Sequence, residues 1–558
     1  MDYRNRMDYR NKKIIIYGNN RYQREFQNIY DDLKVEYYVD DDLSVGVNSL
    51  DTILYENPDD TFVIICKPIA EHENAIKNLT SRKLIQQKNF CLADDLFVEL
   101  DIDLSMEIAG RKVVVWGTGS MAKEFYNHYK TNYPSLHIDF FVDSDPNKCG
   151  QLFYDKRIES FSHINDWSDY YVIVAIADYK YDEINKVIKE KGVTNKFISA
   201  SLLLLEKPST LLMKTFYDTN LYPEIQCSKL NDLRILKDGN ICPCCMASNY
   251  IMGNVFINMP EEIWSSIYEK IFRLSLVNKT FSFCDRARCP LLVNRQEIAI
   301  EERNREKDEL TMNPMPDRPY LLLLELDSSC NIMCTSCRDS IIIEENDFYD
   351  ALSKTIIDHY LDCSERLILT GNGEVLVSKY GKRILASDLC KRRKKISILT
   401  NGLVFNRYHW EQYFSAYDIV DVSVSMDAAC EETYERIRRK SNWRILNDNL
   451  AFIKQLKLDG KIGYFQINFV VQKNNVHEMA DFVRLGKKYG VDRVLFSMLE
   501  NWNYSEEEYA RNSVFDKNSL IKEEYQSYFE HEILEDPIID FTNIAQAVNK
   551  YAKNAYMY

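Results

Sequence analysis

One pattern constrains the fold more than any other feature of the sequence, because it occurs twice. Residues 13–18 (KIIIYG) and 112–117 (KVVVWG) are apolar runs that end in glycine and precede a stretch with helical spacing. In each copy a second apolar run follows and ends in an acidic residue. Strands and helices that alternate at this pace are typical of parallel α/β units. The sequence therefore predicts two Rossmann-like domains, at residues 12–105 and 110–207.

The second copy carries a glycine pattern suited to a phosphate. A GxGxxA turn with Gly117 and Gly119 lies between strand and helix, where the backbone can approach a phosphate and the helix N-terminus favours its charge. Asp143 follows 24 residues after Gly119, a position suited to a ribose hydroxyl. In the first copy, Asn20 and Tyr22 replace small residues. We expect a nucleotide, if one binds, in the second copy, whereas the first copy is structural or binds a different ligand.

The composition argues against several classes of function. The chain has 558 residues and a net charge of −15, whereas a nucleic-acid partner requires a basic face. It has no apolar run of about 18 residues that could cross a membrane, and its first residues do not resemble a signal peptide. Fifteen cysteines in such a chain favour metal ligands over disulfides. We expect a cytoplasmic protein without a membrane span or a nucleic-acid partner.

Three cysteines form the sharpest motif of the chain. Cys330, Cys334 and Cys337 are spaced as CxxxCxxC and follow the apolar run LLLLELD. Three thiolates in a tight loop can bind three irons of a 4Fe–4S cluster and leave the fourth iron open. A structural zinc site prefers four closed ligands. The motif favours an iron–sulfur cluster, with zinc as the alternative.

Beyond Pro319, short apolar runs alternate with helical stretches again. The six predicted strands are residues 321–326, 366–369, 396–400, 420–425, 463–471 and 494–497. This alternation predicts a partial (β/α)6 TIM barrel at residues 319–505, followed by a helical segment at 506–558. With the two Rossmann-like domains and a cysteine-rich segment at 223–298, the fold class is a multidomain α/β protein.

Polar residues follow the ends of the predicted barrel strands, where sites of (β/α) folds gather. Glu374 can receive an ammonium group, and the glycines beside it allow close backbone approach. Ser425 and Asp427 share one face, and an arginine such as Arg438 can pair with a carboxylate through two hydrogen bonds. These groups together meet the needs of S-adenosylmethionine (SAM). The candidate SAM-binding residues are Gly371, Gly373, Glu374, Ser425, Asp427 and one arginine among Arg436, Arg438 and Arg439.

Residues 319–505 resemble the core of the radical SAM enzymes. The resemblance rests on CNIMCTSC, on GNGEVL in place of the family's GGEP, and on SVSMDAACEETYERIRR. It implies that one iron of the cluster binds SAM and that reduction cleaves SAM to methionine and a 5′-deoxyadenosyl radical. This radical would take hydrogen from the substrate. The resemblance also implies an electron donor such as flavodoxin or ferredoxin, and it identifies no catalytic residue beyond the cluster.

The same resemblance assigns roles to the residues at the strand ends. By position in the family motifs, Gly373 and Glu374 match the site for the amino group of SAM. Ser425 and Arg438 match the carboxylate site, and Asp427 matches the ribose site. Asn372 replaces a glycine of the GGEP motif and Val375 replaces its proline, which leaves open whether the backbone carbonyl groups there contact SAM.

The cysteine-rich segment at 223–298 resembles the SPASM or twitch type of auxiliary cluster domain. A cysteine, a DG turn, a CC pair, GNV, IW and two further cysteines occur in that order. The resemblance implies an auxiliary iron–sulfur cluster, and a four-thiolate zinc site is the alternative. The segment precedes the radical SAM core, whereas this domain usually follows it. The predicted ligands are Cys227, Cys244, Cys284 and Cys289, with Cys242 or Cys245 as substitutes for Cys244.

The leading functional hypothesis is therefore a radical SAM enzyme. GTGSMAKEF and FVDSDPNKCG in the second copy resemble Rossmann-like domains found beside sugar-modifying and polysaccharide-assembly enzymes. This resemblance favours a nucleotide-linked or sugar-derived small-molecule substrate in polysaccharide assembly. Maturation of a ribosomal peptide is the alternative reaction. A zinc-binding scaffold with a degenerate barrel is the alternative from another class.

Overall fold

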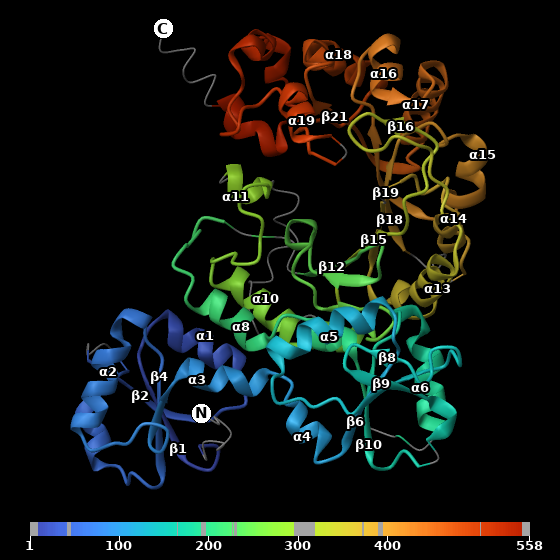
Figure 1. Ribbon diagram of the computed structural model, residues 1–558. Helices are drawn as coiled ribbons and strands as arrows, with labels where there is room; N and C mark the ends of the chain where they lie inside the picture. Colours follow the sequence, from blue (N-terminus) through green and yellow to red (C-terminus); the bar gives the residue numbers. More distant parts are fainter. Residues whose placement is uncertain are drawn as a thin grey trace. The chain divides into compact units, whose positions relative to one another are not determined.

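The structure is a computed structural model with two compact α/β units (Figure 1). One unit takes the chain up to residue 226 together with 265–283, and the other takes 227–264, 284–294 and the chain from 318 onward. The structure describes residues 9–41, 46–164, 166–190, 193, 197–225, 227, 231–294, 318–370, 373–388, 394–502 and 504–549.

The first copy of the repeat forms a parallel five-stranded sheet. Its strands lie in the order β3 (Asn48–Ser49), β2 (Val35–Asp40), β1 (Lys13–Tyr17), β4 (Thr61–Ile65) and β5 (Phe90–Leu92). The main helices of this copy are α1 (Arg21–Ile29), α2 (Ile69–Ser81) and α3 (Ala93–Phe97). The four apolar residues that end β1 are all buried, as the sequence pattern predicts for a strand covered on both faces.

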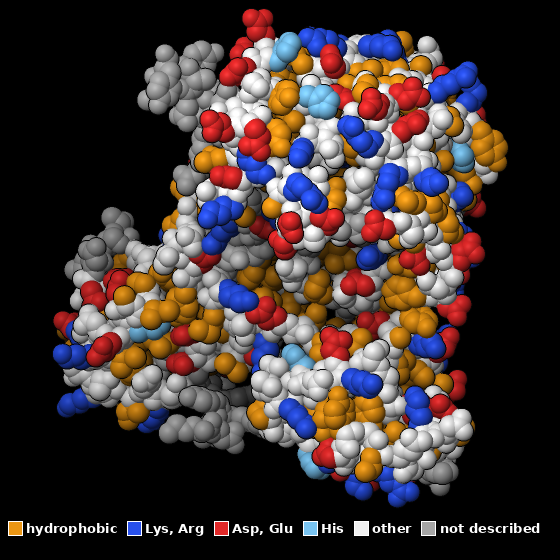
Figure 2. Space-filling model, turned by 45° about the horizontal axis from the view of Figure 1, so that its top comes forward, with side chains coloured by type: hydrophobic (Ala, Val, Ile, Leu, Met, Phe, Trp, Pro, Cys, Tyr) orange, Lys and Arg blue, Asp and Glu red, His pale blue; other side chains and the backbone are white. Residues whose placement is uncertain are grey.

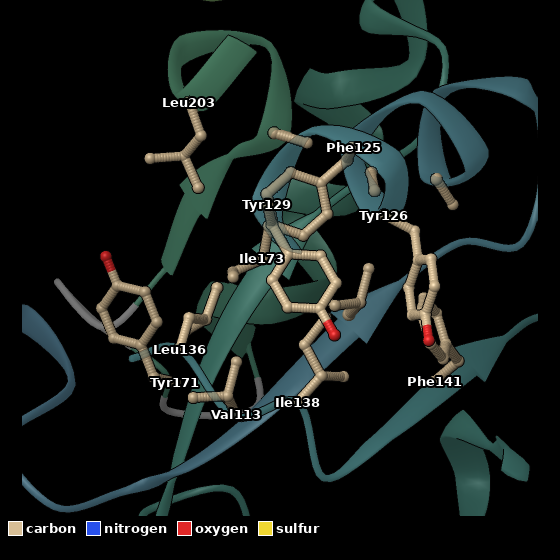
Figure 3. Packing of buried hydrophobic residues seen from close by; sticks show 14 of the residues in the cluster. Val113, Phe125, Tyr126, Tyr129, Leu136, Ile138, Phe141, Tyr171, Ile173 and Leu203 are labelled. Atoms are coloured by element: carbon tan, nitrogen blue, oxygen red, sulfur yellow. The ribbon is translucent and has the colours of Figure 1, made fainter. Parts of the chain in front are cut away.

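The second copy forms a six-stranded sheet with the same central arrangement. Its strands lie in the order β11 (Phe197–Ser199), β10 (Tyr170–Val174), β6 (Lys112–Trp116), β7 (Phe140–Asp143), β9 (Lys156–Ser160) and β8 (Leu152–Phe153). All neighbours are parallel except the β8–β9 hairpin. Phe125 and Tyr129 of α5 (Ser120–Asn132) belong to the same buried cluster as Val113 and Ile173 of the sheet (Figure 3).

The glycine that ends the first strand of each copy is required by close packing. Gly18 has φ +138°, and a Cβ there would lie 2.3 Å from the carbonyl oxygen of Cys66. Gly117 has φ +114°, and its Cβ would lie 2.4 Å from the carbonyl oxygen of Ala175. Gly119 differs, because a Cβ there would meet no atom within 4 Å. The repeated glycine therefore serves the fold, and only Gly119 leaves open space at the turn.

The second unit is built on a ten-stranded sheet. The six strands predicted between residues 319 and 505 are all present, parallel and adjacent in chain order. They are β15 (Leu321–Glu325), β17 (Arg366–Thr370), β18 (Lys395–Thr400), β19 (Asp418–Ser425), β21 (Ile462–Val471) and β22 (Arg493–Met498). The helices between them include α13 (Asp347–Thr355), α14 (Lys379–Leu385), α16 (Glu431–Ile437), α17 (Trp443–Leu458) and α18 (Met479–Tyr489).

The cysteine-rich segment continues this sheet rather than forming a separate body. Strand β12 (Asp232–Ile235) pairs in parallel with β15, and β13 (Asn240–Cys242) and β14 (Gly253–Asn254) extend the edge in antiparallel register. Within the same segment, α10 (Ile267–Val277) belongs to the other unit. Main-chain pairing therefore joins the cysteine-rich segment to the strands after residue 319, and the limits 223–298 stay a prediction.

The carboxyl-terminal segment is less helical than the sequence suggests. It begins with α19 (Glu506–Asn512), continues in 3₁₀ turns, and adds β23 (Ile539–Asp540) to the sheet beside β22. None of the helices in the described ranges has the length and apolar character needed to cross a bilayer. On the face shown in Figure 2, acidic and basic side chains are interspersed, without a continuous basic surface.

Candidate active site and auxiliary cysteine site

The CxxxCxxC loop follows β15 and is fixed by backbone hydrogen bonds. The Cys330 N–H donates to the carbonyl oxygen of Ile342 at 2.9 Å. Farther along the loop, β16 (Met333–Cys334) pairs in antiparallel register with β20 (Arg438–Arg439). The loop is therefore tied to the segment that follows α16, although about a hundred residues separate the two in the sequence.

Each of the three thiols in this loop accepts a hydrogen bond from a different side chain. Asn401 Nδ2 donates to Cys330 Sγ at 3.9 Å, Arg438 Nη1 to Cys334 Sγ at 3.8 Å, and Arg338 Nε and Nη2 to Cys337 Sγ at 3.4 and 3.5 Å. Donors aimed at a sulfur favour its charged form. Hydrogen bonds to the sulfurs also help to set the reduction potential of iron–sulfur clusters.

The surroundings of the thiols fit an iron–sulfur cluster. Burial raises the pKa of Cys334 to about 11, against the opposing effect of Arg438. A bound metal cation deprotonates a coordinating thiol outright, which removes this cost of burial. No three side chains of the described part with thiol, imidazole or carboxylate groups are grouped to hold one metal ion. A cubane does not need such a group, because each thiolate binds a different iron.

Glu374 is buried beside the loop and is held by the end of β18. Its Oε1 accepts the Thr400 hydroxyl at 2.9 Å, and its Oε2 accepts the Asn401 N–H at 2.6 Å. Burial raises the pKa of Glu374 to about 7, although these hydrogen bonds act in the opposite direction. An ammonium group placed next to Glu374 would favour the charged carboxylate. The predicted role of Glu374 as an ammonium acceptor therefore fits its environment.

The residues before Glu374 touch the cysteine loop. The Glu374 N–H donates to the carbonyl oxygen of Ser329 at 2.7 Å. A Cβ at Gly373 would lie 2.1 Å from the same oxygen, so this position requires glycine. Gly371, the other predicted glycine, lies outside the described residues. The backbone after β17 and the backbone before Cys330 are thus in direct contact.

Polar side chains of β19 and β21 line one face of the sheet. Ser423 Oγ accepts Gln466 Nε2 at 3.1 Å and Asn468 Nδ2 at 2.9 Å. Ser425 lies opposite Asn468 in the strand register. Ser423 and Ser425 are half-buried, whereas Val424 between them is fully buried. The two serines therefore share a face, as the alternation predicts.

Asp427 and Arg438 form a buried ion pair. Arg438 Nη2 donates to Asp427 Oδ2 at 2.7 Å, and Arg438 Nε donates to the carbonyl oxygen of Met426 at 3.1 Å. The other Asp427 oxygen accepts the Val470 N–H at 2.8 Å. The sequence assigns these residues to the ribose and the carboxylate of SAM. The structure brings both beside Cys334, where each already has protein partners.

The auxiliary cysteines are brought together by one loop-to-loop contact. Cys244 and Cys245 follow β13 in a tight turn, and the Met246 N–H donates to Cys244 Sγ at 3.2 Å. The Asp285 N–H donates to the carbonyl oxygen of Met246 at 2.7 Å. Asp285 also accepts backbone N–H groups of its own loop. The loop that carries Cys284 and Cys289 is therefore fixed against this turn.

The auxiliary thiols lie close enough to influence one another's pKa values. Burial and the neighbouring thiols of Cys227, Cys289 and Cys245 raise the pKa of Cys284. The contact with Cys245 and burial raise the pKa of Cys244. Cys242 is fully buried in the sheet, where its S–H donates to the carbonyl oxygen of Cys244 at 3.8 Å. The thiols of Cys227, Cys244, Cys245, Cys284 and Cys289 influence one another, and Cys242 also interacts with Cys245.

In the second copy of the repeat, Asp143 already has partners. It accepts the Thr118 hydroxyl, Lys148 Nζ at 2.9 Å and the Asp145 N–H at 2.9 Å. Gly119 caps α5 without a side-chain hydrogen bond. A ribose hydroxyl at Asp143 would have to share the carboxylate with Lys148. The turn has the predicted glycine geometry, and nucleotide binding stays a prediction.

Three residues of the cysteine site have hydrogen-bonding roles that the sequence did not predict. Thr400 and Asn401 connect Glu374 to the loop, and Arg338 covers Cys337. Asn401 carries a weak signal, because NG directly follows a predicted barrel strand. Arg338 carries a stronger one, since it is adjacent to a predicted ligand. A count of predicted ligands alone does not reveal these donors.

A three-thiol loop after a strand of a parallel sheet, with a buried carboxylate beside it, is the arrangement expected of a radical SAM protein. Comparisons with known proteins agree with this class. Residues 227–290 match the SPASM family, described as an iron–sulfur cluster-binding domain. Residues 109–199 match the family C2185-like, N-terminal. The chain is a radical SAM protein with a SPASM domain, and its cofactors are SAM, the 4Fe–4S cluster that binds SAM and an auxiliary iron–sulfur cluster.

Two curated relatives are similar to part of the chain. The antilisterial bacteriocin subtilosin biosynthesis protein AlbA of Bacillus subtilis is 26% identical over 218 residues, which are 36% of this chain and 44% of AlbA. The AdoMet-dependent heme synthase of Methanosarcina barkeri is 26% identical over 189 residues, which are 32% of this chain and 50% of the synthase. The chain thus spans about half the length of each relative.

Two solved structures show weaker likenesses. Streptococcus suis SuiB bound to precursor peptide SuiA has a TM-score of 0.28 and 12% identity, and the match covers 43% of this chain and 46% of SuiB. Native anSMEcpe with bound AdoMet and Kp18Cys peptide has a TM-score of 0.28 and 18% identity. That match covers 38% of this chain and 58% of anSMEcpe. Likenesses of this size carry no information on the substrate.

Proposed function

We propose that this chain is a radical SAM enzyme that abstracts hydrogen from a peptide substrate. The observation that carries the proposal is the set of three thiols, each with its own N–H donor, next to the buried carboxylate of Glu374. We interpret the six parallel strands as the partial (β/α)6 barrel of this class. In the first of the two other sheets β1 lies between β2 and β4, and in the second β6 lies between β7 and β10, which supports our interpretation of both as Rossmann-like.

Different residues at the strand ends would bind the cluster and the different parts of SAM. Cys330, Cys334 and Cys337 would hold the cluster, and Glu374 would accept the ammonium group of SAM. Ser425, together with the Asp427–Arg438 pair, would border the rest of the molecule. When bound, the reduced cluster and SAM supply the one-electron cleavage that yields methionine and a 5′-deoxyadenosyl radical. The protein then has to position the substrate, since the cofactor supplies the difficult chemistry.

The choice of a peptide rests on the curated relatives. AlbA is named for its part in the biosynthesis of a bacteriocin. Neither curated relative supports the nucleotide-linked or sugar-derived substrate that the sequence favoured. Maturation of a ribosomal peptide, the alternative hypothesis from the sequence, is therefore the substrate class that we propose.

The auxiliary site would serve the same reaction. Its candidate ligands are Cys227, Cys244, Cys284 and Cys289, and Cys245 is in contact with Cys244. A second cluster there would orient the peptide or conduct an electron. The electron for SAM cleavage would come from a donor such as flavodoxin or ferredoxin. A nucleotide in the second Rossmann-like copy would be independent of this chemistry.

The proposal is tested with the full chain, reconstituted anaerobically and reduced. We expect about eight irons per chain and a broad absorption near 400 nm, as two clusters require. SAM should be cleaved to 5′-deoxyadenosine, and a short peptide encoded beside this gene should increase the yield. If a uridine diphosphate sugar stimulates cleavage and the peptide does not, the substrate class is wrong. A colourless protein with zinc and no iron would contradict the enzyme itself.

A further inference from the structure

We infer that Arg338 is a positioning residue that raises the reduction potential of the SAM-binding cluster by donating two N–H groups to Cys337. This inference rests on the proposed function, because it requires a cluster on Cys330, Cys334 and Cys337. It concerns a residue outside the cysteine motif and outside the residues that would contact SAM.

The first observation is the geometry of the Arg338 side chain. Its Nε and Nη2 lie 3.4 and 3.5 Å from Cys337 Sγ, within the range of an N–H···S hydrogen bond. Its Nη1 donates to the carbonyl oxygen of Ser328 at 2.5 Å. One edge of the guanidinium thus faces the sulfur, and another nitrogen is fixed to the start of the cysteine loop. Arg338 is only 8% exposed, so the surrounding protein restricts its position.

The backbone of Arg338 is also held. Arg439 Nη2 donates to the carbonyl oxygen of Arg338 at 3.0 Å, and Arg439 Nε donates to the carbonyl oxygen of Met333 at 3.1 Å. The Arg338 N–H donates to the carbonyl oxygen of Cys334 at 3.1 Å. The guanidinium is therefore preorganised beside the sulfur, because both ends of the residue are anchored to the cysteine loop.

The second observation is the difference in charge among the three donors. Asn401, which donates to Cys330, is a neutral amide. Arg438, which donates to Cys334, has its charge offset by Asp427 at 2.7 Å. Arg338 brings a guanidinium whose contacts with Cys337 and Ser328 are to a sulfur and a carbonyl oxygen. Among the three donors, Arg338 is therefore the one that directs two N–H groups of a guanidinium at a single sulfur.

The third observation is the exposure of the sulfur itself. Cys330 is buried and Cys334 is half-buried, whereas Cys337 is exposed. Water at an exposed ligand screens charge and competes for the sulfur. A fixed guanidinium supplies hydrogen bonds to Cys337 that do not depend on water. Addition of an electron makes the cluster more negative, and a nearby cation with N–H···S bonds stabilises that state.

The test is a redox titration of the reconstituted full chain, followed by the electron paramagnetic resonance (EPR) signal that responds to SAM. In Arg338→Gln we expect the midpoint potential of this signal to shift to more negative values, with iron content unchanged. Arg338→Lys keeps the charge but loses the planar pair of donors, so its potential should lie between those of Arg338→Gln and wild type. Arg484→Gln removes the same charge from α18, where Arg484 contacts Asp481 and His531, and should leave the potential unchanged.

An unchanged potential in an iron-loaded Arg338→Gln protein would overturn the inference. If Arg338→Gln does not take up iron, Arg338→Lys decides, and a potential equal to that of wild type overturns it. Failure of the proposed function looks different, since the wild-type chain would then hold no SAM-responsive cluster at all. A purely structural role of Arg338 would lower thermal stability or iron content without moving the potential.

Discussion

In the unit built on the two smaller sheets, acids at the strand ends are matched by lysines. Asp40, the last residue of β2, pairs with Lys67 Nζ at 2.9 Å, and Asp143, the last residue of β7, pairs with Lys148 Nζ at 2.9 Å. In the unit built on the ten-stranded sheet, polar side chains near the strand ends donate hydrogen bonds to the cysteine thiols instead. Both units have parallel strands whose carboxyl ends gather polar groups. The difference teaches that the same architecture can gather either charge pairs or thiols at its strand ends, and that only the thiols with their N–H donors fit an iron–sulfur cluster.

The largest effect is expected from a thiol of the cysteine loop. Cys334→Ala should abolish formation of 5′-deoxyadenosine and remove about half of the iron, because a cubane that loses a protein ligand is no longer held in the loop. The matched control is Cys149→Ala, which removes a half-buried thiol from the other unit. Product analysis by liquid chromatography and iron determination measure both effects. If Cys334→Ala still cleaved SAM to 5′-deoxyadenosine, the CxxxCxxC loop would not be the feature that distinguishes the two units chemically.

A second variant separates the two cysteine sites within one unit. Cys284→Ala should lower the iron content to about four per chain, since only the cluster of the CxxxCxxC loop would remain. Uncoupled cleavage of SAM should continue, whereas modification of the peptide should stop. Iron determination and mass spectrometry of the peptide distinguish these outcomes. Retention of all the iron in Cys284→Ala would show that Cys284 is not a ligand.

Glu374→Gln should weaken SAM binding by roughly 10- to 100-fold, because a hydrogen bond to a charged group contributes about 1.5–3 kcal/mol. Equilibrium binding of SAM to the reconstituted protein measures this loss. Glu374→Asp is the matched control, because it keeps the charge but shortens the side chain. An unchanged affinity in Glu374→Gln would show that the ammonium group of SAM binds elsewhere.

The pKa of Glu374 also predicts how stability depends on pH. Burial raises this pKa from 4.5 to about 7, so between these values the folded protein binds the proton more tightly than the unfolded chain. The stabilisation from this group is complete below about pH 4.5 and is lost as the pH rises through about 7. Linkage sets its upper limit on the order of 3 kcal/mol. Without SAM, thermal unfolding should therefore change more between pH 5 and 8 in wild type than in Glu374→Gln. An equal change would contradict the raised pKa.

Substitution of the two glycines of the second copy should affect stability to very different extents. Gly117→Ala places a Cβ 2.4 Å from the Ala175 carbonyl oxygen at a φ of +114°, and it should cost roughly 2–4 kcal/mol in stability. Gly119→Val extends into open space and should change stability much less. Thermal unfolding measures both, and titration with NAD or a uridine diphosphate sugar tests binding. Unchanged nucleotide binding in Gly119→Val would show that the nucleotide does not bind at this turn.

The sequence predicts the strands of this protein better than the pairing between distant strands. The six apolar runs after Pro319 are strands and parallel neighbours in the structure. They were predictable because a continuous apolar run can be recognised from local periodicity. The sharing of a sheet by β12 and β15 cannot be read in this way, since it depends on main-chain pairing across about ninety residues. The ranges of the predicted domains reflect composition, and composition carries no record of that pairing.

The candidate site was predictable to a similar degree. Cys334 and Glu374 stand out because their residue types and spacing are specific to the chemistry. The donors Asn401 and Arg338 come from common residue types whose roles depend on three-dimensional placement. The ion pair of Asp427 with Arg438 was not predictable either, because each residue alone suggests a contact with SAM.

The central claim is that the thiols of Cys330, Cys334 and Cys337 hold a cluster with an iron open to SAM. The most direct measurement is the EPR spectrum of dithionite-reduced Cys284→Ala, which should retain only this cluster, recorded before and after addition of SAM. We predict that SAM changes the g values of the signal, because its binding at the open iron would alter the electronic environment of the cluster. A spectrum that SAM leaves unchanged would contradict the account.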